Sequence, residues 1–361
     1  MPRLLIVGGT GRIGSALAAA LRAARGDCEI RIGGRRREVG MALARRLGAG
    51  ISFVPVDVND AHQLGSALAG VDLVIHAAGP FQGAAPTVLD AAIAARARYL
   101  DIADDLAFAQ AARSRHPQAV QAGVAALVNG GIFPGLSNVM AGLLIERGGE
   151  VAGVDFSYFV AGTGGAGPAV MASTFLLAGQ PATEYVDGQP QGRPAFAGRR
   201  VAQFPAPVGR RACFRVELPE VSSCHAVYGV PAVSARFGTA PGLWNYNTRL
   251  VGRLPRRWVR NRRWVEAFVR LLWPLLRLVD RFVGAAIGMR VDVRLADGRV
   301  RTIRYSHSQT VPAIATAVAA QAFELLDGKV APGVFWPEEG IGDKAAHLAR
   351  AAIGAIVDDG G

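Results

Sequence analysis

The chain has 361 residues and a formal net charge of +12, and 51% of its residues are hydrophobic. This apolar content excludes a disordered chain, and the length suits two domains with sizeable cores. We expect no membrane span, because no run of 18 uncharged apolar residues occurs. The three cysteines are far apart and lack metal-ligand spacing, which favours free thiols in a cytoplasmic protein.

The positive charge is carried almost entirely by arginine, because Lys329 and Lys344 are the only lysines. It is also uneven: ten arginines stand against two acids between Arg249 and Arg281. No basic groove with interleaved aromatic residues and no known nucleic-acid motif accompanies it. We therefore expect no nucleic-acid partner.

The first 130 residues alternate short apolar runs with Ala- and Leu-rich helical segments. The runs predict strands at 4–7, 29–32, 52–56, 72–75, 99–102 and 124–128, with helices at 13–25, 38–47, 61–68, 86–97 and 106–114. Such a rhythm requires a parallel sheet covered on both faces. We predict an α/β fold whose N-terminal Rossmann domain, a doubly wound parallel sheet, covers residues 1–130.

The pattern changes near residue 151, where alternating apolar and polar residues become common. The clearest case is a hairpin in which Asp297-Gly298 joins strands at 289–296 and 299–305. We predict a second α+β domain at 131–308, with a mostly antiparallel sheet, for substrate binding and dimerisation. The remaining residues, 309–361, are expected to form helices, at 311–326 and 344–357, that pack back near the first domain.

The first strand is followed at once by a glycine-rich loop that opens a helix. Gly9, Gly11 and Gly14 fit the G-x-G-x-x-G pattern of dinucleotide-binding turns. Glycine allows the backbone to approach a pyrophosphate, and the helix N-terminus attracts its negative charge. We expect the whole loop to contact the cofactor: Gly8, Gly9, Thr10, Gly11, Arg12, Ile13 and Gly14.

The end of the second strand predicts which dinucleotide binds. An NAD site places a carboxylate there, about 20 residues after the loop, to hold the ribose 2′-hydroxyl. This chain has Arg35 and Arg36 instead, and a guanidinium suits a 2′-phosphate. We therefore predict NADP(H). Asp57 and Val58, after the third strand, are placed to meet the adenine, although Asp57 also fits a simple turn residue.

Small residues follow the fourth strand, where a cofactor would cross the edge of the sheet. They are Ala77, Ala78, Gly79 and Pro80, and we expect them to line the cofactor site.

Four segments in this order resemble the saccharopine dehydrogenase-like reductases: GGTGRIG, the GGR after the second strand, HAAGPF followed by RYLDIADD, and GIFPGLSN. The resemblance covers roughly the first 140 residues well. It implies an NADP-binding Rossmann domain with a substrate domain that often dimerises, and reduction of C=N bonds or of enoyl lipids. It also implies that Asp101 and the turn before Asn138 face nicotinamide or substrate, and we expect Phe81, Phe133 and Asn138 to contact substrate.

A short-chain dehydrogenase is the main rival with similar early glycines. Its chemistry needs a Tyr-x-x-x-Lys pair, which two lysines near the C-terminus cannot supply. A second rival, from a different class, is a Rossmann protein that binds NADP but has lost its chemistry and acts as a regulator or scaffold. Turnover of the cofactor separates that rival from the reductase.

Hydride transfer belongs to the cofactor, so the protein must orient the substrate and handle one proton. Asp101 and His76 are the predicted catalytic residues, since both stand at the C-terminal end of a strand. Either is equally compatible with a structural role, as a helix cap or a packed histidine. The further titratable candidates are Tyr99, Asp104, His225 and His307. No cluster has metal-ligand spacing, so we predict no metal.

The arginine-rich stretch ends in a basic amphipathic helix, with apolar residues on one face from Val265 to Val283 and a kink expected at Pro274. Two interpretations stay open. Such a helix lies on an anionic membrane surface, which would make a cytoplasmic enzyme peripheral to the membrane and would fit a lipid-like substrate. Otherwise it packs within the substrate domain or at the interface of a homodimer.

Overall fold

Strands and helices alternate through the N-terminal part of the chain, as the hydrophobic pattern predicts. The computed structural model describes residues 1–165, 168, 171–172, 175–176, 181–251 and 261–359. The chain forms two units, the first made of residues 1–136 and 314–351, and the second of residues 137–313 and 352–361. The first unit therefore extends beyond residue 130 and includes a segment from near the C-terminus.

The first unit is built on a seven-stranded sheet whose neighbouring strands are all parallel, in the order β15-β6-β5-β4-β1-β2-β3. The strands are β1 (Arg3–Val7), β2 (Glu29–Gly34), β3 (Ile51–Pro55), β4 (Leu73–His76), β5 (Arg98–Asp101), β6 (Ala125–Leu127) and β15 (Gly333–Phe335). The order reverses beside β1, so the carboxyl ends of β1 and β4 form the crevice where ligands bind in such sheets.

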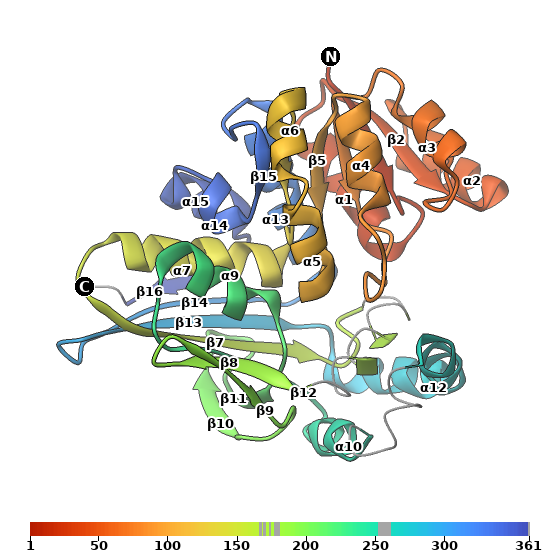
Figure 1. The fold of residues 1–361 in the computed structure, drawn as a ribbon. Coiled ribbons are helices and arrows are strands. Elements are labelled where there is room, and N and C mark those ends of the chain that lie inside the picture. Colours follow the sequence, from red (N-terminus) through yellow and green to blue (C-terminus); the bar gives the residue numbers. More distant parts are fainter. Residues whose placement is uncertain (166–167, 169–170, 173–174, 177–180, 252–260, 360–361) are drawn as a thin grey trace. The chain divides into compact units, whose positions relative to one another are not determined.

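Helices cover both faces of this sheet (Figure 1). They are α1 (Arg12–Ala24), α2 (Arg37–Leu47), α3 (Ala61–Leu68), α4 (Thr87–Ala94), α5 (Leu106–Arg113), α6 (His116–Ala122), α14 (Pro337–Gly340) and α15 (Lys344–Ala351). The central strand β1 is buried on both sides, since Leu4, Leu5 and Ile6 are fully buried. This explains why the sequence of β1 is a continuous apolar run and does not alternate between apolar and polar residues.

The second unit is built on a nine-stranded sheet with the main order β10-β11-β12-β7-β13-β14-β16, and β8 and β9 attached to β12. The strands are β7 (Val151–Ala161), β8 (Ala182–Val186), β9 (Gln189–Arg193), β10 (Arg200–Gln203), β11 (Arg210–Arg215), β12 (Val233–Ala240), β13 (Ile287–Leu295), β14 (Val300–His307) and β16 (Ala355–Asp358). Every pair is antiparallel except β12 with β7. The predicted fold class is thus confirmed.

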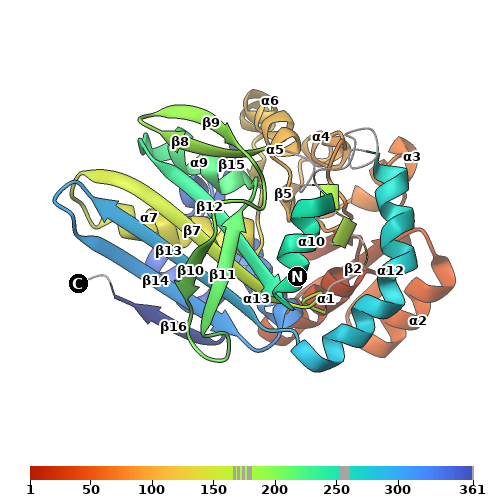
Figure 2. The same cartoon turned by 90° about the horizontal axis from the view of Figure 1, so that it is seen from below.

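The hairpin predicted at Asp297-Gly298 is present, because β13 and β14 pair in antiparallel register around it. Figure 2 shows β13, β14 and β16 side by side at one edge of the sheet. Further helices are α7 (Ser137–Glu146), α9 (Pro219–Tyr228), α10 (Leu243–Val251) and α12 (Arg262–Val283), while α13 (Thr310–Leu326) passes from the second unit into the first.

The helix predicted at 344–357 is too long. It ends at Ala351, and residues 355–358 form β16 on the second sheet. Gly354 stands between them at φ +130°, a conformation that side chains rarely adopt, and a Cβ there would lie 2.4 Å from the carbonyl oxygen of Ser306. The glycine therefore lets the backbone pass close to β14 before it pairs with that strand as β16.

No helix among the described residues combines the length and the apolar character needed to cross a membrane.

Candidate functional site

The glycine-rich loop after β1 leaves no room for side chains at three of its glycines. Gly8 has φ +84°, and a Cβ there would lie 2.8 Å from the backbone of Ala77. A Cβ on Gly14 would lie 2.4 Å from the carbonyl oxygen of Gly8, and one on Gly9 would lie 2.8 Å from that of Ile6. These distances are far below van der Waals contact, so the loop, α1 and the end of β4 pack backbone against backbone.

The N-terminus of α1 is open to an anion. Its N-cap, Gly11, makes no side-chain hydrogen bond, and the first turn contains no acidic residue. Two other helices of the same unit are capped by carboxylates, α3 by Asp60 and α5 by Asp105. The positive end of the α1 dipole, directly after the glycine loop, is therefore available to a bound phosphate.

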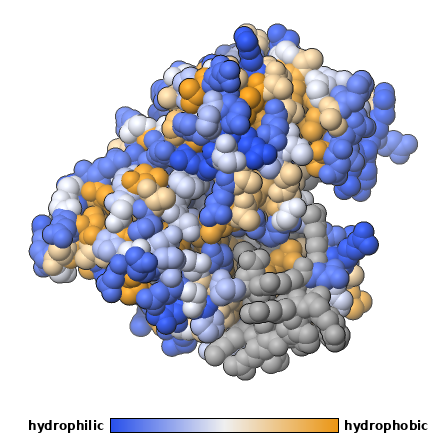
Figure 3. Space-filling view, in the orientation of Figure 1, coloured by the Kyte–Doolittle hydropathy of each residue, from blue (hydrophilic) through white to orange (hydrophobic). Residues whose placement is uncertain are grey.

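The end of β2 carries arginine where an NAD site would carry a carboxylate. Arg35 and Arg36 follow Gly34 directly, are exposed, and have no ion-pair partner among the described residues. A Cβ on Gly34 would lie 2.6 Å from the hydroxyl oxygen of Thr10, so the strand end lies against the glycine-rich loop. On the face of the molecule shown in Figure 3, the surface around α2 is almost wholly hydrophilic.

Asp57 lies after β3 and is half-buried. Its Oδ1 accepts hydrogen bonds from the backbone N–H of Asn59 at 3.0 Å and from the Asn59 amide at 3.2 Å. This is a local turn around the carboxylate, while the cap of α3 is Asp60. Val58 beside it is also half-buried.

Beyond β4, Ala77 and Ala78 are partly exposed at the strand end, and Gly79 is exposed before a cis bond to Pro80. Phe81 turns inward: it is 4% exposed and belongs to the core, with its ring 4.9 Å from that of His76 and 5.0 Å from that of Phe108. The structure thus places Phe81 as a packing residue behind the strand ends.

The two predicted catalytic residues lie opposite each other, because His76 and Asp101 are register partners on β4 and β5. Both are buried. The imidazole Nδ1 of His76 lies 3.3 Å from the Tyr99 hydroxyl, and its Nε2 has no hydrogen-bond partner among the described residues. Burial lowers the pKa of His76 to about 4, so the ring is neutral at pH 7.

The Asp101 carboxyl is held by backbone. Its Oδ1 accepts from the N–H groups of Ala103 at 3.0 Å and Asn129 at 2.8 Å. Burial raises the pKa of Asp101 to about 6, with those two donors acting in the opposite direction. Burial, and the negative charge of Asp101, also raise the pKa of Tyr99 well above its ordinary value. A carboxyl with this pKa exchanges its proton near neutral pH.

Sequence reasoning did not identify Asn129 and Gln321 as partners of this cluster. Asn129 is buried with φ +56° at the end of β6, and its amide donates to the carbonyl of Ala103 at 2.8 Å. Gln321 on α13 holds the next turn through the N–H and carbonyl of Gly131, at 2.9 and 3.0 Å. The Asn-Gly-Gly sequence after an apolar run was the available signal for the first, whereas nothing local marks the second.

Other predicted residues have contacts of their own, outside the hydrogen bonds of this cluster. Phe133 is half-buried in the turn η1 (Ile132–Leu136) of the first unit. Asn138 is buried in the second unit, where its amide donates to the Ser223 hydroxyl at 2.9 Å. Asp104 accepts from the Gln82 amide at 3.1 Å.

The second unit also holds the two remaining histidine candidates. The ring of His225 stacks on that of Tyr185 at 3.9 Å, and His307 Nδ1 lies 2.7 Å from the Gln309 carbonyl oxygen. Among the described residues, no group of three His, Cys, Asp or Glu side chains is arranged to hold a metal ion.

The strand order of the parallel sheet reverses beside a glycine-lined loop, and the helix that follows this loop has an N-terminus open to phosphate. These features define a dinucleotide-binding domain. Residues 4–127 match the family model of the saccharopine dehydrogenase NADP binding domain. NADP(H) is therefore its cofactor, as predicted, and the resemblance stated from the sequence is confirmed. The glycine loop and the uncapped α1 fit its pyrophosphate.

Solved structures extend the likeness to the whole chain. The saccharopine dehydrogenase (L-Glu forming) of Saccharomyces cerevisiae is 16% identical, with a TM-score of 0.68 over 99% of this chain and 100% of that one. The homospermidine synthase of Legionella pneumophila, in complex with NAD, is 13% identical, with a TM-score of 0.65 over 99% of this chain and 90% of that one. At these identities the likeness establishes a shared fold. No curated protein sequence matches this chain.

Proposed function

We propose that the protein is an NADPH-dependent oxidoreductase that transfers hydride to a C=N bond or an activated C=C bond of a small or lipid-like substrate. The observation that carries the proposal is the pair of exposed, unpaired arginines at the end of β2, beside a glycine loop that fits a dinucleotide. Bound NADPH supplies the hydride. Arg35 and Arg36 would hold its 2′-phosphate, and the strand-end loops would hold the rest.

The proton that follows the hydride needs an acid from the protein. Asp101 is the proposed proton carrier, because its pKa of about 6 lies near neutrality and its Oδ2 has no hydrogen-bond partner among the described residues. His76 is neutral at pH 7 and better suited to orient a neighbour than to give up a proton. The proposed roles are therefore unequal, with Asp101 moving the proton and His76 positioning Tyr99.

Removing the Arg35 side chain tests the cofactor preference and the activity together. Purified wild type and Arg35→Ala are titrated with NADPH and NADH by nicotinamide fluorescence, and NADPH oxidation is then followed with imine and enoyl acceptors. We expect wild type to prefer NADPH at least tenfold, and the variant to lose most of that preference while NADH binding stays the same. Arg45→Ala, in the last turn of α2, is the control with the same charge change.

Equal binding of both cofactors by wild type contradicts the 2′-phosphate site. NADPH binding without oxidation by any acceptor class favours a binding or scaffold protein over a reductase.

A separate observation concerns membrane contact. The helix α12 buries Val265, Val269 and Leu276, but four apolar residues on the adjoining stripe are exposed: Leu271 at 78%, Leu275 at 57%, Leu278 at 49% and Phe282 at 83%. Their spacing of four, three and four residues keeps them in one line. Arginines 263, 270, 277 and 281 are exposed on the same helix. The residues 252–260 before it lie outside the described part.

We propose that α12 lies on an anionic membrane surface, with the exposed stripe among the acyl chains and its arginines toward lipid headgroups. Arginine next to an apolar stripe suits acidic headgroups better than it suits a second copy of an equally basic helix. The helix continues through Pro274 to Val283, so the stripe is continuous.

Vesicle sedimentation tests this surface. Wild type is expected to sediment with phosphatidylcholine vesicles containing phosphatidylglycerol and to stay in solution with phosphatidylcholine alone. Leu271→Ser with Phe282→Ser should lose at least tenfold in vesicle binding, whereas Met41→Ser with Val300→Ser, which changes exposed apolar residues elsewhere, should not. Failure of wild type to sediment contradicts the proposal. A dimer in light scattering that only the α12 variant dissociates would instead make the stripe a homodimer interface.

A further inference from the structure

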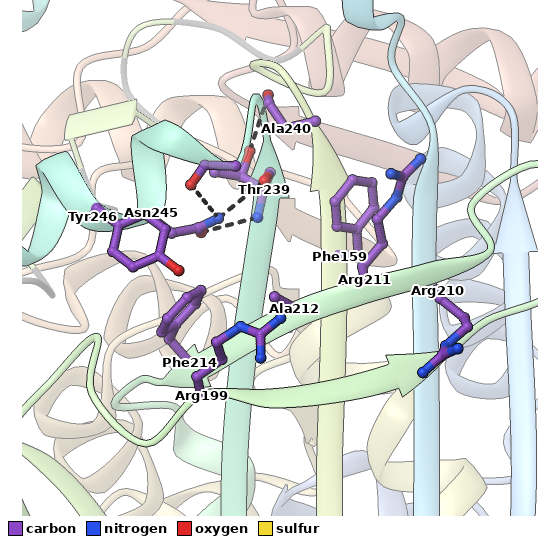
Figure 4. Close-up of a pocket in the computed structure, with 11 residues that line it drawn as sticks. Phe159, Arg199, Arg210, Arg211, Ala212, Phe214, Thr239, Ala240, Asn245 and Tyr246 are labelled. Carbon is purple, nitrogen blue, oxygen red and sulfur yellow. Dashed lines mark hydrogen bonds between the residues drawn. The ribbon is translucent and has the colours of Figure 1, made fainter.

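The second unit contains a pocket of about 250 Å³ that the hydride-transfer proposal does not use. Its walls come from five places in the sequence: Phe159 on β7, Arg199 just before β10, residues 210–212 and 214 on β11, the end of β12, and the start of α10. Figure 4 shows these side chains arranged around the space.

One wall is fixed by Asn245. The side chain is 2% exposed, its Oδ1 accepts from the N–H of Thr239 at 3.1 Å, and its amide donates to the Thr239 carbonyl at 3.1 Å and to that of Gly242 at 3.2 Å (Figure 4). The start of α10 is thereby tied to the end of β12. The pocket consequently has a preformed wall, which reduces the ordering that a ligand would require.

The charged groups at the pocket are all positive. Arg199, Arg210 and Arg211 line it, no Asp or Glu does, and none of the three has an ion-pair partner among the described residues. Their neighbours on the same strands are paired: Arg200 lies 3.0 Å from Asp155, and Arg215 lies 2.7 Å from Glu184. The acids of this sheet thus neutralise other arginines and leave the pocket cationic.

The rest of the lining is aromatic. Phe159 and Phe214 are buried, and the ring of Phe214 lies edge-on to that of Tyr246 at 5.5 Å. The guanidinium of Arg211 lies 5.0 Å from the centre of the Phe159 ring, a cation–π distance. Flat apolar walls beside unpaired guanidinium groups suit a ligand that joins a planar apolar body to an anionic head.

We propose that this pocket binds a small organic anion, a carboxylate or phosphate ester on a planar apolar body. The anion pairs with Arg199 and Arg211, and the body packs on Phe214 and Tyr246. All lining residues of the pocket belong to the second unit, whereas the glycine-rich loop belongs to the first, so binding of an anion is tested separately from the proposed reductase activity.

Calorimetric titration with naphthalene-2-carboxylate and 2-naphthyl phosphate tests the site and distinguishes the two head groups, with naphthalene-2-carboxamide as the uncharged match. We expect at least one anion to bind wild type at least tenfold more tightly than the amide. Arg199→Ala with Arg211→Ala should weaken that binding at least tenfold, because each charge-assisted hydrogen bond contributes strongly to binding. Both arginines are exposed, so the fold should persist, which thermal unfolding checks.

The control Arg270→Ala with Arg299→Ala removes the same charge from exposed positions outside the pocket and should change anion affinity less than twofold. NADPH binding should be the same in all variants. The proposal is overturned by equal affinity for the anions and the amide, by equal losses in pocket and control variants, or by absence of binding to wild type.

Discussion

Gly14→Ala is expected to lower NADPH affinity at least a hundredfold. The added Cβ would lie 2.4 Å from the carbonyl oxygen of Gly8 and 2.7 Å from the Cα of Gly9, so the phosphate loop must move away from α1. Both neighbours are backbone and cannot rotate aside, and overpacking of this kind costs about 1–3 kcal/mol of stability. The loss of binding follows from displacing the N–H groups that meet the pyrophosphate. Nicotinamide fluorescence measures the affinity, and circular dichroism checks the fold.

A matched control exists in the same unit. Gly65 lies inside α3, and a Cβ there would meet nothing within 4 Å. Gly65→Ala should therefore keep NADPH affinity and gain up to about 1 kcal/mol of stability from helix propensity. The added Cβ in Gly11→Ala would meet only the Gly8 carbonyl oxygen, at 3.1 Å, so this variant should show an intermediate loss of NADPH affinity. It replaces Gly14→Ala in the test if that variant does not fold. Unchanged binding in both loop variants would place the cofactor elsewhere.

The cofactor loop could be predicted because its determinants are local. A buried strand, three glycines at fixed spacing and a helix follow one another within 24 residues, and the same physical requirements produce both the motif and the geometry. The Rossmann strands β1 to β6 were predictable for the same reason. By contrast, β15 has only three residues and joins β6 from more than 200 positions later, so no period within it indicates a strand.

The candidate catalytic cluster was predictable only in part. The ends of β4 and β5 indicate His76 and Asp101, since parallel strands align their carboxyl ends. What sets their chemistry is burial together with the N–H of Asn129 and the hydroxyl of Tyr99, which depend on how the strands and loops pack. Neither a pKa near 6 for the acid nor one near 4 for the histidine can be read from residue types alone.

Those two pKa values predict opposite effects of pH on stability. Asp101 has a pKa of about 6 in the folded protein against an ordinary value of 3.8, so between pH 4 and 6 the folded state holds a proton that the unfolded state has lost. Its contribution therefore falls as pH rises through this window, by about 3 kcal/mol. His76, at about 4 against 6.5, is protonated only in the unfolded state between these values, so its contribution falls as pH decreases, by about 3 kcal/mol.

Single variants should separate the two effects, which largely cancel in wild type between pH 4 and 6. Asp101→Asn keeps an oxygen for the N–H groups of Ala103 and Asn129 and removes the carboxyl titration, so this variant should lose stability more steeply than wild type on acidification. His76→Gln removes the other titration and should lose stability less steeply. Urea unfolding at several values from pH 4 to 6.5 gives the three free-energy profiles. Parallel profiles of unfolding free energy against pH would mean that burial does not shift the pKa of either group. The proposal that Asp101 carries the proton would then be contradicted.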